Sequence, residues 1–336
     1  MARIAINGFG RVGRQAFKAM RLYYPDQLEI VAVNDLTSND VLAHLLKYDS
    51  NYGRYDAEIS STEDSITVDD IEVKVFEERD WARLPWGDLG VDLVIESSGR
   101  GTDASKARAH IEAGAKKVMI SAPAKGEDVT IVLGVNEDWY DPAKHNIVSN
   151  ASCTTNALAP VAKVMLEHFG IVQGLVTTVH AYTNDQVMLD GPHKDLRRAR
   201  AAATNIIPTT TGAARALGIV LPKLKGKFDG LSLRVPTPTV SVIDFVAELQ
   251  RDTTAEEVNS CFEQAASGSL GRVLGYTREP LVSTDFKEIT ESTVVDGLST
   301  MVMGGRLAKV ISWYDNEWGY SVRVADVASL MAERGF

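Results

Sequence analysis

The chain has only two cysteines, Cys153 and Cys261, among its 336 residues. So few cysteines argue against a disulfide framework and favour a reducing cytoplasm. No apolar run approaches the length of a membrane span, and the N-terminus begins with a strand-like segment rather than a signal peptide. Basic residues are also in deficit, since 35 Lys and Arg face 45 Asp and Glu, a formal net charge of -10. We therefore expect a cytoplasmic protein that binds neither membranes nor, as its main role, nucleic acids.

What remains is the composition of an ordinary globular protein, with 45% hydrophobic and 24% charged residues. A chain of this length exceeds what one core usually holds, so two domains are expected. The first half alternates strands and helices, one helix being expected over about residues 103–113, which favours a doubly wound parallel sheet with a hairpin at residues 65–75. The second half mixes helices with longer apolar strands, which favours an α+β domain with a mainly antiparallel sheet.

The chain opens with an apolar strand, a Gly-x-Gly-x-x-Gly turn, a helix to about residue 23 and a second apolar strand. In such a turn Gly8 allows the tight bend, and Gly10 lets the backbone approach a pyrophosphate. Gly13 lets the helix pack on the strand, while the start of the helix faces the phosphates. The pattern predicts a dinucleotide site.

Asp35 follows the second strand, 22 residues after Gly13. A carboxylate there can bind the adenosine ribose hydroxyls and repels a 2′-phosphate, so the sequence favours NAD over NADP. Arg11 lies within the phosphate turn. Further candidates for the nicotinamide side follow two later strands of the sheet, where loop serines are equally expected: Ser98, Gly99 and Ser121.

Cys153 lies between a short strand at residues 146–148 and a stretch from Ala157 to Phe169 with helical spacing of apolar residues. Ser152 or Thr154 suits the N-cap. A thiol at a helix N-terminus is expected to have a lowered pKa, which suits a nucleophile. On this stretch alone a buried structural cysteine is the alternative.

His180 ends a β-branched strand that begins at Gly174, and a polar loop follows it. The other five histidines fall in helical segments or loops without such a setting. Paired with Cys153, a histidine at a strand end is a candidate general base. We expect no metal site.

The densest basic patch spans residues 193–200, where a solvated face or a subunit contact is the alternative to a phosphate site. Arginine has the fork geometry that binds phosphate. A hydroxyl-rich turn at Thr209–Gly212 precedes a helix and forms a second candidate anion site. Arg234 is a single arginine within an apolar strand, which is also compatible with anion binding.

Taken together, these stretches resemble the phosphorylating glyceraldehyde-3-phosphate dehydrogenases across essentially the whole chain. The resemblance rests on five motifs, namely the segments 5–14, 149–156, 193–200, 209–212 and 313–320. The chain departs from many members in having Ala157 instead of a second cysteine. It also has Ser97-Ser98-Gly99-Arg100-Gly101 instead of the more familiar Thr-Gly after that strand.

The resemblance implies a Rossmann domain at residues 1–152, completed by the C-terminal helix 317–336, and a catalytic α+β domain at 153–316. It also implies a homotetramer. Cys153 is then the nucleophile and His180 the base. The expected contacts with NAD are Arg11, Val12, Asp35, Arg79, Ser121 and Asn316. The phosphate of the substrate is expected near Thr183 and Arg234, and inorganic phosphate near Ser152, Thr154, Arg198, Thr211 and Gly212.

The predicted reaction is the oxidation of glyceraldehyde 3-phosphate to 1,3-bisphosphoglycerate, through a thiohemiacetal and a thioester on Cys153, in glycolysis or gluconeogenesis. Two alternatives remain. An erythrose-4-phosphate dehydrogenase would hydrolyse the thioester with water and need no inorganic phosphate. A cofactor-binding regulator that uses the basic patch to bind RNA is a secondary role at most for a chain of this charge.

Overall fold

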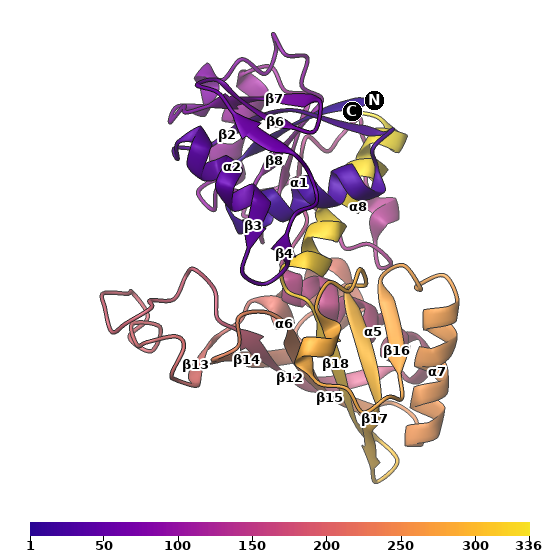
Figure 1. Ribbon diagram of the computed structural model, residues 1–336. Helices are drawn as coiled ribbons and strands as arrows, with labels where there is room; N and C mark the ends of the chain where they lie inside the picture. The colour runs from indigo at the N-terminus through magenta and orange to yellow at the C-terminus, as the bar shows by residue number, and fades with distance from the viewer. The chain divides into compact units, whose positions relative to one another are not determined.

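The computed structural model describes all residues from 1 to 336, and the chain forms two compact units, each with its own sheet (Figure 1). Unit 1 comprises Met1–Ile131, Glu137–Ala151 and Ser321–Phe336, and unit 2 comprises Val132–Asn136 and Ser152–Tyr320. No helix combines the length and the apolar character that crossing a bilayer requires.

Unit 1 contains a nine-stranded sheet whose central strands are all parallel. The predicted hairpin lies at one edge, where β6 pairs antiparallel with both β7 and β5. In spatial order the strands are β10 (Val129–Thr130), β11 (Ile147–Ser149), β9 (Lys117–Ile120), β8 (Leu93–Glu96), β1 (Ala2–Asn7), β2 (Leu28–Asn34), β7 (Ile71–Phe76), β6 (Ser65–Val68) and β5 (Ile59–Ser61). The carboxyl ends of the central strands therefore share one edge, where ligands bind in sheets of this kind.

Helix α1 (Arg11–Tyr23) starts directly at the glycine turn and buries Ala16, Phe17, Ala19 and Met20. A second helix, α2 (Asn39–Lys47), follows β2, and a small ribbon joins β3 (Tyr48–Asp49) to β4 (Gly53–Arg54). The helix expected at residues 103–113 is divided into α3 (Ala104–Ala107) and α4 (Ala109–Glu112). The division arises because N–H groups there also reach carbonyls three residues back, as Ile111 does to Arg108, which tightens the helix locally.

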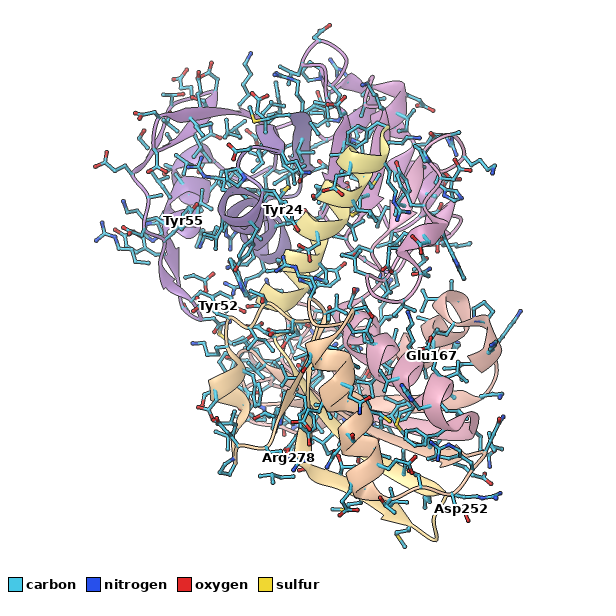
Figure 2. All side chains as sticks on the ribbon, turned by 90° about the vertical axis from the view of Figure 1, so that its right-hand side faces the viewer. Tyr24, Tyr52, Tyr55, Glu167, Asp252 and Arg278 are labelled. Atoms are coloured by element: carbon cyan, nitrogen blue, oxygen red, sulfur yellow. The ribbon has the colours of Figure 1, made fainter.

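The last helix, α8 (Trp318–Arg334), begins in unit 2 and runs for most of its length in unit 1. Within unit 1 the Tyr24 hydroxyl donates to Asp326 at 2.5 Å, and Figure 2 shows Tyr24 beside this helix. The Ser329 hydroxyl donates to Gln27 at 2.5 Å, and the Tyr140 hydroxyl to the Gly335 carbonyl at 3.0 Å. These bonds anchor the C-terminal segment to residues far away in the sequence.

Unit 2 contains a seven-stranded, mainly antiparallel sheet, as the sequence predicts. Its strands are, in spatial order, β13 (Ile207–Thr210), β14 (Phe228–Val235), β12 (Ile171–Ala181), β15 (Ser241–Leu249), β18 (Leu307–Tyr314), β17 (Thr293–Met303) and β16 (Leu274–Thr277). Three helices accompany it: α5 (Cys153–Phe169), α6 (Ala213–Val220) and α7 (Ala255–Ser267).

Helix α5 positions the predicted nucleophile. Leu158, Val161, Met165 and Phe169 lie on its apolar side and are at most 1% exposed. Burying side chains of this size stabilises a fold by about 1.5–3 kcal/mol each, so the helix and its first residue are held firmly.

Candidate active site

The glycine turn of unit 1 has the close approaches that the sequence predicts. Gly8 has φ +92°, and a Cβ there would lie 2.4 Å from the Ser98 nitrogen. At Gly13 a Cβ would lie 2.2 Å from the Gly8 carbonyl oxygen, whereas at Gly10 it would meet nothing within 4 Å. Two glycines therefore serve tight packing, and the third leaves its side of the turn open. This geometry fits a pyrophosphate at the start of α1.

A cleft of about 300 Å³ opens at this turn. Asp35 lines it, and its carboxylate accepts hydrogen bonds from the Phe9 N–H at 2.8 Å and the Thr37 N–H at 3.1 Å. The cleft therefore brings the acidic residue to the phosphate turn. Four more predicted residues line the cleft: Gly8, Gly10, Arg79 and Ser98. The lining also includes residues that sequence reasoning did not single out, namely Asn7, Asn34, Glu78, Trp81 and Arg100.

Three other predicted cofactor residues of unit 1 lie outside the lining of the cleft, namely Arg11, Val12 and Ser121. The guanidinium of Arg11 pairs with Asp49 at 2.7 Å and lies 5.9 Å from the centre of the Tyr52 ring, which Figure 2 labels. Val12 lies in the first turn of α1. Ser121 follows β9, and its hydroxyl donates to the Glu96 carbonyl at 3.2 Å. Neither Val12 nor Ser121 lines the cleft.

Cys153 is the first residue of α5, as expected for a thiol at a helix start. Ser152 is the N-cap, and its Oγ accepts a hydrogen bond from the Thr155 N–H at 3.0 Å. Ala151, immediately before the cap, has φ +54°, a left-handed conformation that is uncommon for alanine. The backbone before Cys153 is therefore bent sharply into the helix.

His180 lies in β12 and faces the thiol. Its Nε2 is 3.6 Å from the Cys153 Sγ, and its Nδ1 is 2.6 Å from the Ala181 carbonyl oxygen. The short contact assigns the ring proton to Nδ1, because only an N–H can bond a carbonyl oxygen. The lone pair of Nε2 is therefore directed at the thiol. The predicted nucleophile and base are brought together.

Arg234 lies on β14, in register with His180 on β12. Its Nη1 has two hydrogens and two oxygen acceptors, the Ala181 carbonyl at 3.2 Å and the Thr183 hydroxyl at 3.3 Å. The His180 Nδ1, 3.0 Å from Nη1, therefore keeps its own proton for the closer contact of 2.6 Å with the same carbonyl. The Arg234 Nε is buried and has no hydrogen-bond partner. The structure thus brings Arg234 and Thr183 together beside the Cys–His pair.

Burial controls the charge state of this cluster. It raises the pKa of the Cys153 thiol, although the nearby Arg234 acts in the opposite direction. Burial, with the help of Arg234, lowers the pKa of His180 to about 3. The expectation of a lowered thiol pKa at the helix start is therefore wrong, because withdrawal of the thiol from water outweighs the favourable charges. The pair rests as a neutral thiol and a neutral imidazole.

Tyr314 is a site residue that sequence reasoning did not single out. Its buried hydroxyl bonds the hydroxyls of Thr154 at 2.9 Å and Thr178 at 2.8 Å, and its ring packs edge-on against His180. Thr154 is therefore engaged with Tyr314. The only signal in the sequence is the position of Tyr314 within the 313–320 motif.

The other predicted anion-binding residues of unit 2 are Arg198, Thr211 and Gly212, and their hydrogen bonds join them to residues other than Cys153 and His180. Arg198 donates to Thr209 at 2.9 Å and pairs with Asp185, so its charge is already met by a carboxylate. Gly212 is the N-cap of α6, and the Thr211 hydroxyl accepts from the Ala213 N–H at 3.2 Å.

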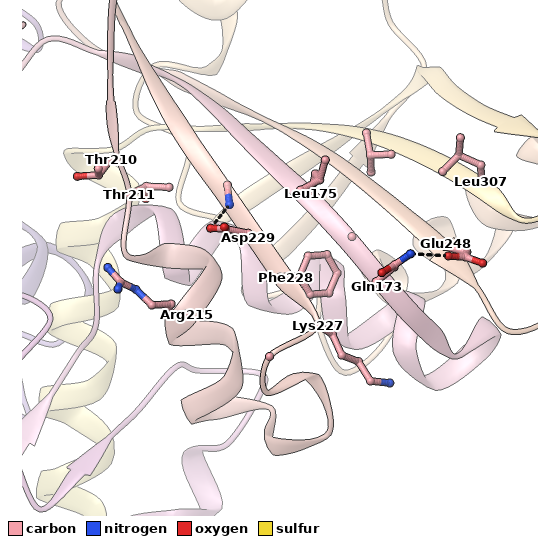
Figure 3. A pocket seen from close by; sticks show the side chains of 14 residues that line it. Gln173, Leu175, Thr210, Thr211, Arg215, Lys227, Phe228, Asp229, Glu248 and Leu307 are labelled. Atoms are coloured by element: carbon pink, nitrogen blue, oxygen red, sulfur yellow. Dashed lines mark hydrogen bonds between the residues drawn. The ribbon is translucent and has the colours of Figure 1, made fainter.

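A groove of about 840 Å³ crosses another part of unit 2 (Figure 3). Thr211 lines it together with Arg215 and apolar residues such as Leu175 and Phe228, but neither Cys153 nor His180 does. Asn316 is buried in unit 2, and its Oδ1 accepts a hydrogen bond from the Ser241 hydroxyl at 2.9 Å.

A parallel sheet with a glycine turn, an acidic residue after the next strand and a cleft between them define a dinucleotide-binding enzyme. The second unit adds a thiol in contact with an imidazole. Together they place the chain in the class of NAD-dependent oxidoreductases.

Comparison with known proteins identifies the family. Residues 2–104 match the model of the glyceraldehyde 3-phosphate dehydrogenase NAD binding domain, and residues 152–316 match that of the C-terminal domain. The chain is 60% identical to the glyceraldehyde-3-phosphate dehydrogenase of Geobacillus stearothermophilus over 333 residues, 99% of each chain. It is 57% identical to glyceraldehyde-3-phosphate dehydrogenase 1 of Bacillus cereus over 335 residues, 100% of each. The chain belongs to the glyceraldehyde-3-phosphate dehydrogenase family, and its cofactor is NAD.

Proposed function

We propose that this enzyme oxidises glyceraldehyde 3-phosphate to 1,3-bisphosphoglycerate in the cytoplasm, as a step of glycolysis or gluconeogenesis, through a covalent intermediate on Cys153. The observation that carries the proposal is the 3.6 Å contact between the Cys153 Sγ and the lone pair of the His180 Nε2. A neutral imidazole that is held in one tautomer can accept the proton of the thiol.

The first step is attack of Sγ on the aldehyde carbon. The S–H proton passes to the His180 Nε2, and from there to the former carbonyl oxygen, which gives a thiohemiacetal. The N–H of Cys153 at the start of α5, where backbone donors lack partners in the helix, steadies the developing oxyanion. The positive charge of Arg234 favours the thiolate during the attack.

NAD, when held at the glycine turn of unit 1, would supply the hydride acceptor for oxidation of the thiohemiacetal. His180 takes the hydroxyl proton in that step, so that the carbon–sulfur group becomes a thioester. Inorganic phosphate then attacks the thioester carbon, the carbon–sulfur bond breaks, and Cys153 recovers a proton. The product is an acyl phosphate.

The cofactor is proposed to lie at the glycine turn, with contacts to Gly8, Gly10, Gly13, Arg11, Val12, Asp35, Arg79, Ser121 and Asn316. Three features of unit 1 support this site: the open side of Gly10, the start of α1 and the position of Asp35 in the cleft. Because the Arg11 guanidinium pairs with Asp49, the backbone of Arg11 is the better candidate for phosphate contact.

Two anion sites serve the two phosphates. The substrate phosphate is proposed to bind Thr183 and Arg234, where the buried, unpartnered Nε of Arg234 can donate to it. Inorganic phosphate is assigned to Ser152, Thr154, Arg198, Thr211 and Gly212. For this purpose Thr154 must share its hydroxyl with Tyr314, and Arg198 must release part of its bond to Asp185.

A homotetramer is also proposed. Three large apolar side chains of the loop after β12 are more than three-quarters exposed: Met188 at 85%, Leu189 at 76% and Leu196 at 82%. Apolar groups that are exposed together on a monomer mark an interaction surface.

The test is NAD reduction measured with glyceraldehyde 3-phosphate and with erythrose 4-phosphate, each with and without inorganic phosphate. We expect phosphate-dependent turnover of glyceraldehyde 3-phosphate and none in Cys153→Ser. Equal turnover of erythrose 4-phosphate without phosphate would instead support the thioester-hydrolysing alternative.

A further inference from the structure

A continuous chain of polar side chains lies beneath the cleft of unit 1. The indole N–H of Trp86 donates to the His110 Nδ1 at 3.1 Å, and the His110 Nε2 lies 3.1 Å from Glu96. Glu96 also accepts from the amide of Asn7, whose oxygen accepts from Asn34 at 2.7 Å. The side chains of Trp86, His110 and Glu96 are at most 2% exposed.

The donor and acceptor of every hydrogen bond in this series of side chains are fixed. An indole nitrogen can only donate, so the His110 Nδ1 accepts and the ring proton lies on Nε2, which donates to Glu96. Asn34 donates to Asn7 and accepts from the Glu78 N–H at 2.8 Å. This fixes the orientation of the Asn7 amide, so its NH₂ group must face Glu96. No member can reverse without leaving a buried donor unpaired.

Glu96 connects this series of hydrogen-bonded side chains to the cleft. Its Oε1 accepts from the Ser98 N–H at 3.0 Å and from the Ser98 hydroxyl at 2.5 Å. The same Ser98 backbone lies against Gly8, where a Cβ would come within 2.4 Å of the Ser98 nitrogen. A Cβ at Gly101 would lie 2.6 Å from the Glu96 Cγ, so the loop 97–101 wraps closely around this carboxylate.

We propose that Glu96 is a positioning residue for the cofactor site. Its carboxylate fixes the loop 97–101 and the end of β1 against the phosphate turn, and thereby preorganises the cleft for NAD. The inference rests on the proposed placement of NAD in this cleft. It assigns a binding role to a buried group that contacts neither the cofactor turn directly nor the Cys–His pair.

Glu96→Gln isolates this role, because it replaces one acceptor oxygen by an NH₂ donor of the same size. That NH₂ cannot replace Oε2, since the donors of Asn7 and His110 are both fixed there. It must replace Oε1, where the Ser98 hydroxyl can turn to accept but the Ser98 N–H loses its acceptor. The defect therefore falls on the backbone at the cleft, and we expect the Kd for NAD to rise about tenfold.

The experiment is titration of the nucleotide-free protein with NAD by calorimetry, together with thermal unfolding of each variant. Val94→Ala is the matched control, because Val94 is a fully buried residue of the same strand in the apolar core beside Trp86. It should lower the Tm and leave the Kd for NAD unchanged. In kinetics, Glu96→Gln should raise the KM for NAD and leave the KM for glyceraldehyde 3-phosphate as in the wild type.

Wild-type affinity in Glu96→Gln, or an equal loss of affinity in Val94→Ala, would overturn the inference. If Glu96→Gln does not fold, His110→Asn serves in its place, since it removes one of the donors that hold Glu96 and His110 is not among the residues that line the cleft. A Kd raised about threefold supports the role of Glu96, and an unchanged Kd overturns it. A wild-type protein that binds no NAD would overturn the proposed function itself.

Discussion

The His180 Nδ1 lies 2.6 Å from the carbonyl oxygen of Ala181, and this contact determines what the other ring nitrogen can do. It holds the proton on Nδ1 and leaves Nε2 as an acceptor 3.6 Å from the Cys153 sulfur. Because burial and Arg234 together hold the pKa of His180 at about 3, the ring is neutral at physiological pH. A neutral base beside a neutral thiol is poised to move the proton during the attack.

His180→Asn should slow the hydride-transfer step by about 10²–10⁴-fold, because the thiol and the thiohemiacetal hydroxyl lose their proton acceptor. Single-turnover formation of NADH measures this step. His168→Asn is the control, since His168 is exposed near the end of α5 and away from the thiol. An unchanged single-turnover rate in His180→Asn would contradict the role of His180.

The stability of the protein should fall in acid because of His180. Its pKa is about 3 in the fold against 6.5 ordinarily, so below pH 6.5 the unfolded chain binds a proton that the folded chain does not. The stability that the neutral ring contributes is complete above pH 6.5 and is lost as the pH falls toward 3. Between pH 7 and 5 the loss is about 2 kcal/mol.

Urea unfolding at pH 7 and pH 5, at one protein concentration, measures this loss. His180→Asn should lose about 2 kcal/mol less than the wild type over that interval, while His168→Asn should behave as the wild type. Parallel pH dependence in the wild type and His180→Asn would show that the buried ring is not the group responsible.

Arg234→Gln should make the Cys153 thiol harder to ionise, because the positive charge of Arg234 lowers the pKa of this thiol. The pH midpoint of alkylation by iodoacetamide should therefore move upward. A shift of one pH unit corresponds to about tenfold slower reaction below the midpoint. Arg197→Gln is the control, since Arg197 is exposed in the nearby basic patch. The same midpoint in all three proteins would count against the electrostatic role of Arg234.

Asp35→Gly should lower the preference for NAD over NADP, measured as the ratio of kcat/KM values, by about tenfold or more, because a repulsive charge is removed. The KM for NAD should also rise, since the Asp35 carboxylate accepts the Phe9 N–H within the turn. Glu72→Gln removes an exposed charge elsewhere in unit 1 and should change neither value. Retained selectivity in Asp35→Gly would refute the assignment.

Most elements of the fold could be predicted because their signals are local. Alternating strands and helices indicated the parallel sheet, and the apolar spacing after Cys153 indicated α5. The helix at residues 103–113 shows the limit of this reasoning, because its division depends on hydrogen bonds to carbonyls three residues back that periodicity does not reveal.

The site was predicted from local sequence motifs. Such motifs do not reveal contacts between segments that are far apart in the sequence. The contact of Tyr314 with Thr154 joins residues 160 apart in sequence, and that of Glu96 with Asn7 joins residues 89 apart. The direction of the thiol pKa was predicted wrongly for the same reason. The helix start is visible in the sequence, but the burial that outweighs it arises only in the fold.

The proposed reaction requires Cys153 to carry the acyl group that phosphate removes. The decisive experiment mixes the enzyme with NAD and glyceraldehyde 3-phosphate without inorganic phosphate, quenches the mixture in acid and determines the mass of the peptide that contains Cys153. We predict an acyl adduct on Cys153, about one NADH per subunit, and loss of the adduct with renewed turnover when phosphate is added. Continued turnover without phosphate, or a Cys153 peptide without an adduct, would refute the covalent mechanism.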